Sequence, residues 1–148
     1  MAWKPDITVA AIVARGQRFL MVEELIQGRQ VLNQPAGHVE ANESPLAAVV
    51  REVLEETACR FEPRHVIGAY LWRKPGSQLD TFRIAFCGEV GAPDPARRFD
   101  HPVIANHWLS RDELLGASAR LRTPLVLRCI DDFLAGRRLP LDSFTDLR

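Results

Sequence analysis

Runs of apolar, β-branched residues alternate along the chain with polar and glycine-containing turns, and these runs predict several strands. Residues 6–15 are typical of a buried strand, Gly16 permits a turn, and residues 18–25 form the expected hairpin partner. A short strand is expected within residues 28–37, ending at Pro35 because proline cannot donate to a strand ladder. Further runs with strand character lie at residues 65–73, 80–90 and 103–110.

The apolar spacing changes to a helical period after residue 44. Positions three or four apart are apolar there, namely Leu46, Val49, Val50, Val53 and Leu54. This stripe predicts the buried face of a helix that runs from Ser44 to about Ala58. Ser44 is a good N-cap, and Pro45 suits the first helical position because its ring fixes φ in the helical range.

Two more helices are predicted nearer the C-terminus. A short one begins after Ser110, and a longer one spans residues 123–138, with Thr123 as its cap and Gly136 near its end. Between the expected strands 80–90 and 103–110 lies a polar loop that contains three prolines. The order of elements predicts an α/β (α+β) fold in which a mixed β-sheet is sandwiched between helices.

The length of 148 residues suits a single domain, so residues 1–148 are expected to share one core. The tail from about residue 139 is expected to be loosely held. No apolar run approaches the roughly 20 residues needed to span a bilayer, and the first residues do not resemble a signal peptide. The cysteines, at positions 59, 87 and 129, are scattered without a CxxC pair. They predict reduced, buried thiols in a cytoplasmic protein and no zinc site.

Charge narrows the class of partner. The chain has 19 basic and 19 acidic residues, a formal net charge of zero, and no basic stripe. Binding to nucleic acid or to a membrane surface is therefore not expected, and a small-molecule partner is favoured. The oligomeric state stays open between a monomer and a homodimer.

The segment REVLEE, residues 51–56, breaks local rules of helix stability. Glu52, Glu55 and Glu56 lie three or four positions apart, and each like-charge pair costs a few tenths of a kcal/mol, roughly. They also lie near the C-terminal end, where the helix dipole disfavours anions by about 0.3–1 kcal/mol each. A hard divalent cation such as Mg²⁺ would resolve the conflict, since it prefers carboxylate oxygens. The alternative interpretation is a solvated acidic face.

The surroundings of this segment resemble the signature of the Nudix family, G-x5-E-x7-R-E-U-x-E-E-x-G-U, where U is a bulky aliphatic residue. The matching positions are Gly37, Glu43, Arg51, Glu52, Val53, Glu55 and Glu56, within a box that covers residues 37–59. Ala58 departs from the family glycine, and Cys59 departs from the aliphatic residue. The resemblance implies a Nudix fold and hydrolysis of phosphoanhydride bonds by attack of water on phosphorus.

The resemblance also implies a role for each matching residue. Glu55 and Glu56 would be the main metal ligands, Glu52 a further ligand or a general base, and the carbonyl of Ala36 an additional ligand. Glu52, Glu55 and Arg51 would form the catalytic set, with Arg51 orienting the glutamates. Glu43 would hold Arg51 or the loop, and Gly37 would let the loop pass close to the helix. The implied cofactor is Mg²⁺, with Mn²⁺ as a possible substitute.

Residues outside the box are weaker candidates. Asn33 and Gln34 precede the box and could read a base edge or a ribose, and Trp72 could stack on a base or serve the core. A fourth acidic ligand is common in the family on a distant loop. Asp94, Asp100 and Glu89 are the candidates for it, and the sequence does not choose among them. His38 could act as an acid or base, or be a solvated loop histidine.

The substrates implied by the resemblance are nucleoside tri- and diphosphates and related pyrophosphates such as hydroxymethylpyrimidine pyrophosphate. One alternative is another specificity within the family, for ADP-ribose, dinucleoside polyphosphates or oxidised nucleotides. A second alternative is a nucleotide-sensing module that does not cleave its ligand. Such modules usually lack some of the box glutamates, whereas this chain has all of them.

Overall fold

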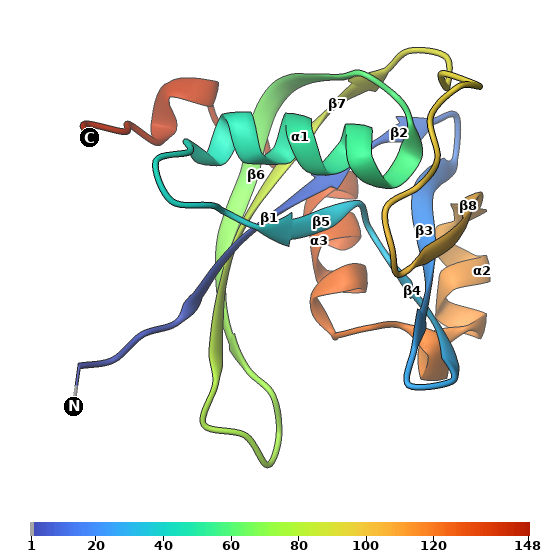
Figure 1. Ribbon diagram of the computed structural model, residues 1–148, viewed down its shortest axis with the longest axis horizontal. Coiled ribbons are helices and arrows are strands. Elements are labelled where there is room, and N and C mark those ends of the chain that lie inside the picture. The colour runs from blue at the N-terminus through green and yellow to red at the C-terminus, as the bar shows by residue number, and fades with distance from the viewer. Residues whose placement is uncertain (1) are drawn as a thin grey trace.

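The computed structural model describes residues 2–148, which form two sheets and the helices that cover them (Figure 1). The first sheet has the strand order β5-β1-β7-β6. Its strands are β1 (Asp6–Ile12), β5 (Ala36–His38), β6 (Phe61–Arg73) and β7 (Asp80–Val90). β1 runs parallel to β7, whereas β5 and β6 pair antiparallel to their neighbours. The sheet is therefore mixed, as expected.

The second sheet is antiparallel and is built around β3 (Arg18–Ile26). That strand pairs with β2 (Ala14–Arg15), β4 (Arg29–Asn33) and β8 (Val103–Ser110). β8 lies far from β3 in the sequence, so this pairing brings the loop before β8 to the side of β3. The second sheet thereby contributes one wall of the site described below.

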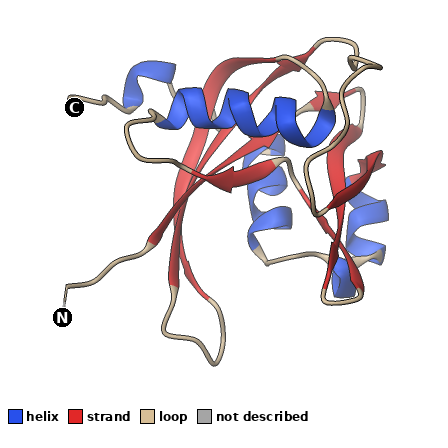
Figure 2. Cartoon of the chain, viewed as in Figure 1, coloured by secondary structure: helices blue, strands red, loops and turns tan. Residues whose placement is uncertain are grey.

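The helices are α1 (Pro45–Thr57), α2 (Arg111–Gly116) and α3 (Leu125–Leu134), with short 3-10 turns η1 (Ser118–Arg120) and η2 (Leu141–Ser143). α1 and α3 cover opposite faces of the first sheet (Figure 2). On β1, Val9 and Ala11 pack in the cluster that contains Val53 of α1, whereas Ile12 packs with Ile130 of α3. This alternation buries both faces of the strand and confirms a mixed sheet between helices. No helix among residues 2–148 is long and apolar enough to cross a membrane.

Several predicted strand boundaries are corrected. The run 28–37 forms two strands, β4 and β5, because Pro35 interrupts it and residues 36–38 turn to pair with β1. The run 6–15 likewise divides, at Val13, into β1 and β2. The expected strand 65–73 is longer, since β6 begins at Phe61 and passes through irregular pairings with β7.

The last helix is shorter than the predicted span of 123–138. α3 begins at Leu125 and ends at Leu134, with Pro124 as its N-cap residue. The Thr123 hydroxyl still accepts a hydrogen bond from the Leu125 amide at 3.1 Å. Gly136 follows the helix with a φ of 86°, a left-handed conformation that suits glycine.

The start of α1 is as predicted, but its buried face differs. Ser44 is the N-cap, and its hydroxyl accepts a hydrogen bond from the Ala47 amide at 3.1 Å. Leu46, expected in the core, is 39% exposed. The helix turns a neighbouring stripe toward the sheet, whose fully buried members include Ala48, Val49 and Val53. Because this stripe continues through Glu56 and Thr57, it draws one glutamate of the acidic segment into the interior.

The end of α1 explains the glycine in the family signature. Ala58, which replaces it, has a φ of 60°, and its amide donates to the Leu54 carbonyl at 3.0 Å. A left-handed conformation costs a non-glycine residue about 1–2 kcal/mol. Burial of the Ala58 methyl group offsets about 0.8 kcal/mol of that cost. Alanine is therefore tolerated here at a small net cost in stability, and the helix still ends at the same position.

The chain after residue 139 lies against the body of the protein. Leu139 forms a backbone bridge with Val66, and the amide of each donates to the carbonyl of the other. Near the end of the chain, Arg148 Nη2 donates to the Glu43 carbonyl at 2.7 Å. The C-terminal segment thus contacts the loop that precedes α1.

Candidate active site

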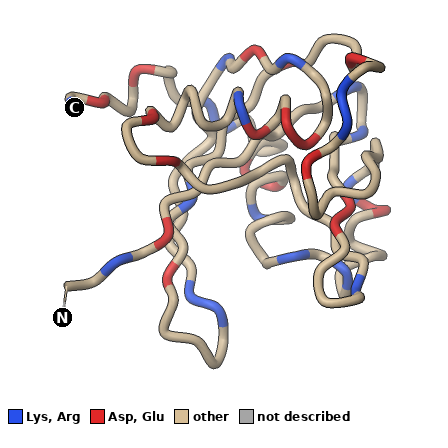
Figure 3. The backbone as a smooth tube through the Cα atoms, in the orientation of Figure 1, with Lys and Arg blue, Asp and Glu red and all other residues tan. Residues whose placement is uncertain are grey.

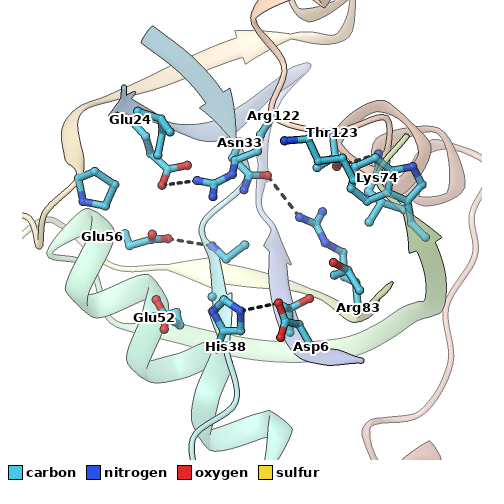
Figure 4. A pocket seen from close by; sticks show the side chains of 18 of the residues that line it. Asp6, Glu24, Asn33, His38, Glu52, Glu56, Lys74, Arg83, Arg122 and Thr123 are labelled. Atoms are coloured by element: carbon cyan, nitrogen blue, oxygen red, sulfur yellow. Dashed lines mark hydrogen bonds and ion pairs between the residues drawn. The ribbon is translucent and has the colours of Figure 1, made fainter. Parts of the chain in front are cut away.

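A cleft with a volume of about 620 Å³ opens between α1, β3, the β6–β7 hairpin and the segment after η1. Its acidic lining residues are Asp6, Glu24, Glu40, Glu52, Glu55, Glu56 and Asp100. Its basic lining residues, apart from histidines, are Lys74, Arg83 and Arg122. Figure 3 shows how acidic residues gather in the C-terminal half of α1. In Figure 4, Glu52 and Glu56 lie across the cleft from Arg83 and Lys74.

Glu56 is the most buried of the three glutamates on α1. It is only 8% exposed, and its Oε1 accepts a hydrogen bond from the Ala36 amide at 2.8 Å. Burial raises the pKa of Glu56 to about 9, and the negative charges of Glu52, Glu24 and Glu55 add to the rise. The folded protein therefore places a carboxylate where neither solvent nor a cationic side chain stabilises its charge.

Glu24 on β3 faces the same region and was not identified from the sequence. It is 5% exposed, and its Oε2 accepts from Arg122 Nη1 at 3.1 Å. Its Oε1 is buried and has no hydrogen-bond partner among the described residues 2–148. The signal in the sequence was the pair Glu23–Glu24 inside a strand whose other residues are mostly apolar. Two adjacent acids in a buried strand are unusual, and both are in fact buried.

Arg51 organises the more exposed half of the acidic group. Its Nε and Nη2 donate to the two carboxylate oxygens of Glu43 at 2.7 and 2.9 Å, a bidentate pair. Its Nη1 donates to Glu52 at 2.9 Å and to Glu55 at 3.2 Å. The Arg51 hydrogen bonds hold the pKa of Glu43 below its usual range, whereas burial raises the pKa of Glu52 despite the same guanidinium. Glu43 thus fixes Arg51, and Arg51 orients two of the three helix glutamates.

Gly37 lies where the β5 backbone passes closest to α1. A Cβ atom at this position would collide with the carboxyl group of Glu52. The side chain of Glu52 thus occupies the space that any residue larger than glycine would need. The glycine of the box and the first of the three helix glutamates depend on each other sterically.

The donor set fits a divalent cation. Within residues 2–148, no group of three histidine, cysteine or acidic side chains is already arranged as a metal site. Glu52 and Glu55 instead face Arg51, and Glu56 faces the Ala36 amide. The unpaired Oε1 of Glu24 and the raised pKa of the buried Glu56 both show that positive charge is lacking at this point. Carboxylate oxygens are the ligands that Mg²⁺ prefers, and reorientation of Glu52 and Glu55 would complete the set.

The candidates for substrate contact occupy different positions. Asn33 and Trp72 both line the cleft, and Trp72 is half-buried at its rim. Gln34 is 1% exposed and does not line the cleft. Its amide donates to the Val126 carbonyl at 2.7 Å, and its Oε1 accepts from Arg83 at 3.0 Å. Gln34 therefore supports the cleft from behind, and the expectation that it touches substrate does not match its position.

Of the candidates for a further acidic ligand, Asp100 lines the cleft, whereas Asp94 and Glu89 do not. The amide of Asp100 donates to the Glu55 carbonyl at 2.9 Å, and the amide of Asp94 donates to the Ala58 carbonyl at 2.9 Å. These two bonds fasten the loop before β8 to the end of α1. His38 also lines the cleft, with its Nε2 3.3 Å from Asp6.

The chain is similar to known proteins along most of its length. A family model for the NUDIX domain matches residues 4–128. The chain is 38% identical over 144 residues to the phosphatase NudJ of Escherichia coli strain K12, which covers 97% of this chain and 93% of the relative. It superposes on a NUDIX hydrolase from Nitrosomonas europaea with a TM-score of 0.93 and 42% identity, covering 97% of each chain. A MutT protein from Methanosarcina mazei, 23% identical with a TM-score of 0.72, covers 93% of this chain and 100% of its own and shares the fold.

Burial of Glu56 predicts that the metal-free protein loses stability as the pH rises. Because the folded-state pKa is raised from 4.5 to about 9, the contribution of Glu56 is complete below pH 4.5 and is lost progressively toward pH 9. Carboxyl groups whose pKa is lowered by folding, such as Glu43, change the stability only below about pH 4.5, so they do not contribute to this decline. Urea unfolding of the metal-free protein between pH 5 and 9 should show the decline, and Glu56→Gln should flatten it. An equally steep decline in the variant would contradict the assignment.

Proposed function

Because this chain belongs to the Nudix family of hydrolases, we propose that it hydrolyses phosphoanhydride bonds in nucleoside tri- and diphosphates and in related pyrophosphates such as hydroxymethylpyrimidine pyrophosphate. Mg²⁺ is the proposed cofactor, with Mn²⁺ as a substitute. The name of the relative, phosphatase NudJ, supports a phosphatase specificity. The likeness spans 97% of this chain and 93% of the relative.

One observation carries the proposal: buried carboxylates and cationic side chains line the same cleft. Glu24, Glu52 and Glu56 lie on one side, whereas Lys74 and Arg83 lie on the other (Figure 4). A nucleotide with a divalent cation fits such a cleft because the cation offers positive charge to the acidic wall, and the nucleotide offers phosphate and ring acceptors to the cationic wall. A neutral metabolite would leave both walls uncompensated.

The cation would be held by Glu52, Glu55 and Glu56, with Glu24 and the Ala36 carbonyl as further oxygen donors. When bound, it supplies charge neutralisation for the phosphate oxygens and promotes ionisation of the attacking water. Arg51 and Glu43 keep Glu52 and Glu55 at the cleft through the bidentate ion pair. Lys74 and Arg122, both at the cleft, are placed to bind phosphate oxygens.

The protein residues also account for the protons of the reaction. An oxygen–phosphorus bond forms to the attacking water as the bridging phosphorus–oxygen bond of the anhydride breaks. Glu52 is the proposed acceptor of the proton from water, because its carboxylate lines the cleft and is less exposed than that of Glu55. The leaving phosphate departs as an anion that needs little protonation. Glu55, whose side chain is more exposed than that of Glu52, is proposed to bind the cation rather than to accept the proton.

The function is tested by a substrate panel with Mg²⁺ and ³¹P NMR in ¹⁸O-labelled water. Orthophosphate should appear from nucleoside tri- and diphosphates and from hydroxymethylpyrimidine pyrophosphate, with the label marking the phosphorus that is attacked. Glu55→Gln should lower turnover by about 100-fold or more, since it removes a charge that the cofactor requires. Glu62→Gln is the control, because Glu62 is an exposed acid on β6 outside the cleft.

Cleavage of ADP-ribose or dinucleoside polyphosphates alone would replace this specificity with another in the same family. Tight Mg²⁺-dependent binding without cleavage of any compound would favour a nucleotide-sensing module. Near wild-type turnover by Glu55→Gln at saturating Mg²⁺ would contradict the role of Glu55.

Gly37→Ala provides a test of geometry rather than charge. The three atoms nearest to the new methyl group would be those of the Glu52 carboxyl group, the end of a flexible side chain, so Glu52 should swing away at little cost to folding. Turnover should then fall at least tenfold, while the unfolding temperature changes by only a few degrees. Gly91→Ala is the matched control, because its Cβ would meet no atom within 4 Å. Equal turnover in the two variants would show that the position of Glu52 is unimportant.

A further inference from the structure

Arg83 on β7 is a buried cation that lines the cleft. It is 4% exposed, and no carboxylate oxygen of residues 2–148 lies within 4.0 Å of its guanidinium nitrogens. Its Nε is buried and has no hydrogen-bond partner among these residues. Buried arginines are normally paired, because an uncompensated charge in the interior is strongly destabilising.

The hydrogen bonds that Arg83 makes all go to uncharged groups. Its Nη1 donates to Gln34 Oε1 at 3.0 Å and lies 3.9 Å from Cys129 Sγ. Its Nη2 donates to Asn33 Oδ1 at 3.4 Å, a long bond. A guanidinium has five N–H donors, so part of its capacity is unused. The unused part includes Nε, and Nη2 has a second N–H besides the one that donates to Asn33.

Other arginines of the same chain show what that edge normally does. Arg51, Arg73 and Arg111 each use Nε and Nη2 together to grip one carboxylate, those of Glu43, Asp80 and Asp131 respectively. This fork matches two oxygens presented in one plane. Arg83 has the same fork in a more buried position and faces no acid with it.

A purely structural role explains Arg83 less well. Arg83 does support Asn33 and Gln34, which lead into the loop that holds Ala36. A neutral side chain could hold two amides without placing a charge in the interior. A cation that lines a cleft and has an unused fork fits a residue that completes its contacts when a ligand enters.

We propose that Arg83 binds the substrate through an oxygen or ring-nitrogen acceptor on the side away from the reacting phosphates. The proposal rests on the proposed function, which places the reacting phosphates at Glu52 and Glu56. Arg83 lies across the cleft from those residues, beside Asn33 (Figure 4). Trp72 and Leu125 line the same cleft and offer apolar surface to a ring. The acceptor edge of a heterocycle fits these surroundings, and a distal phosphate oxygen is the other source of the same chemistry.

The test measures binding rather than cleavage, so that it does not depend on turnover. Calorimetry with Mg²⁺ would compare methylene-bridged, uncleavable analogues of GTP and ATP with inorganic tripolyphosphate. Guanine presents a carbonyl oxygen beside a ring nitrogen, adenine presents an amino group there, and tripolyphosphate has no ring. The proteins are the wild type, Arg83→Gln, Arg83→Lys and the control Arg111→Gln, whose side chain lies outside the cleft.

Arg83→Gln should weaken binding of the GTP analogue about 10- to 100-fold, the range for loss of a bidentate contact. Binding of tripolyphosphate should change less than twofold, and Arg111→Gln should change neither affinity. Equal losses for all three probes would support the binding role with a phosphate oxygen as the acceptor. Arg83→Lys keeps the positive charge but lacks the two parallel N–H donors, so it should fold and still bind the GTP analogue at least fivefold more weakly. This variant therefore tests the proposal even if Arg83→Gln does not fold.

Wild-type affinities for every probe in folded Arg83→Gln and Arg83→Lys would overturn the proposal and leave Arg83 a structural role. Failure of the wild type to bind any probe would instead contradict the proposed function itself, together with this assignment. The unfolding temperature of each variant, measured in parallel, separates lost binding from lost structure.

Discussion

Mutual repulsion between buried carboxylates is the constraint on which the rest of the structure depends. Glu56 is drawn inside because the buried stripe of α1 continues through it, and Glu24 approaches from the second sheet. Neither carboxylate can move into solvent, because both side chains are buried. The close passage of Gly37 past Glu52 adds a third acid to the same space. A fold that gathers these charges is less stable on its own than with positive charge supplied between them.

The protein neutralises only part of this acidic group with its own cations. Arg51 serves Glu43, Glu52 and Glu55 on the accessible side of α1, and its hydrogen bonds do not reach Glu56. Arg122 satisfies one oxygen of Glu24 and leaves the other unpaired. On the opposite wall of the cleft, the buried cation of Arg83 has no acidic partner among residues 2–148. Unmet charge of both signs along one cleft is what a metal-bound nucleotide would satisfy, through its cation at the acidic wall and an acceptor group at Arg83, and binding of the cation and of the substrate would then be electrostatically coupled.

The sequence alone identified the features that depend on residues close together in the chain. Ser44, Pro45 and the box glutamates lie within one helix and its caps, where spacing determines which side chains meet, and the mixed sheet between helices followed from the order of elements. Glu24, Gln34 and the burial of Arg83 depend on non-local pairing. Arg83 alternates with apolar residues along its strand, which predicts a solvent-facing side chain, but α3 covers that face. The register of the buried face of α1 was likewise ambiguous, because two neighbouring stripes are apolar and only the packing against the sheet selects one.

If this acidic group binds a divalent cation, Mg²⁺ must stabilise the folded state. We would therefore measure the unfolding temperature of the protein as MgCl₂ is raised to millimolar concentration, at constant ionic strength maintained with NaCl. Binding to the folded state predicts a rise that continues with the logarithm of Mg²⁺ concentration once the site is saturated, and its loss in Glu56→Gln. An unfolding temperature that does not respond to Mg²⁺, or that rises equally in the variant, would contradict the account.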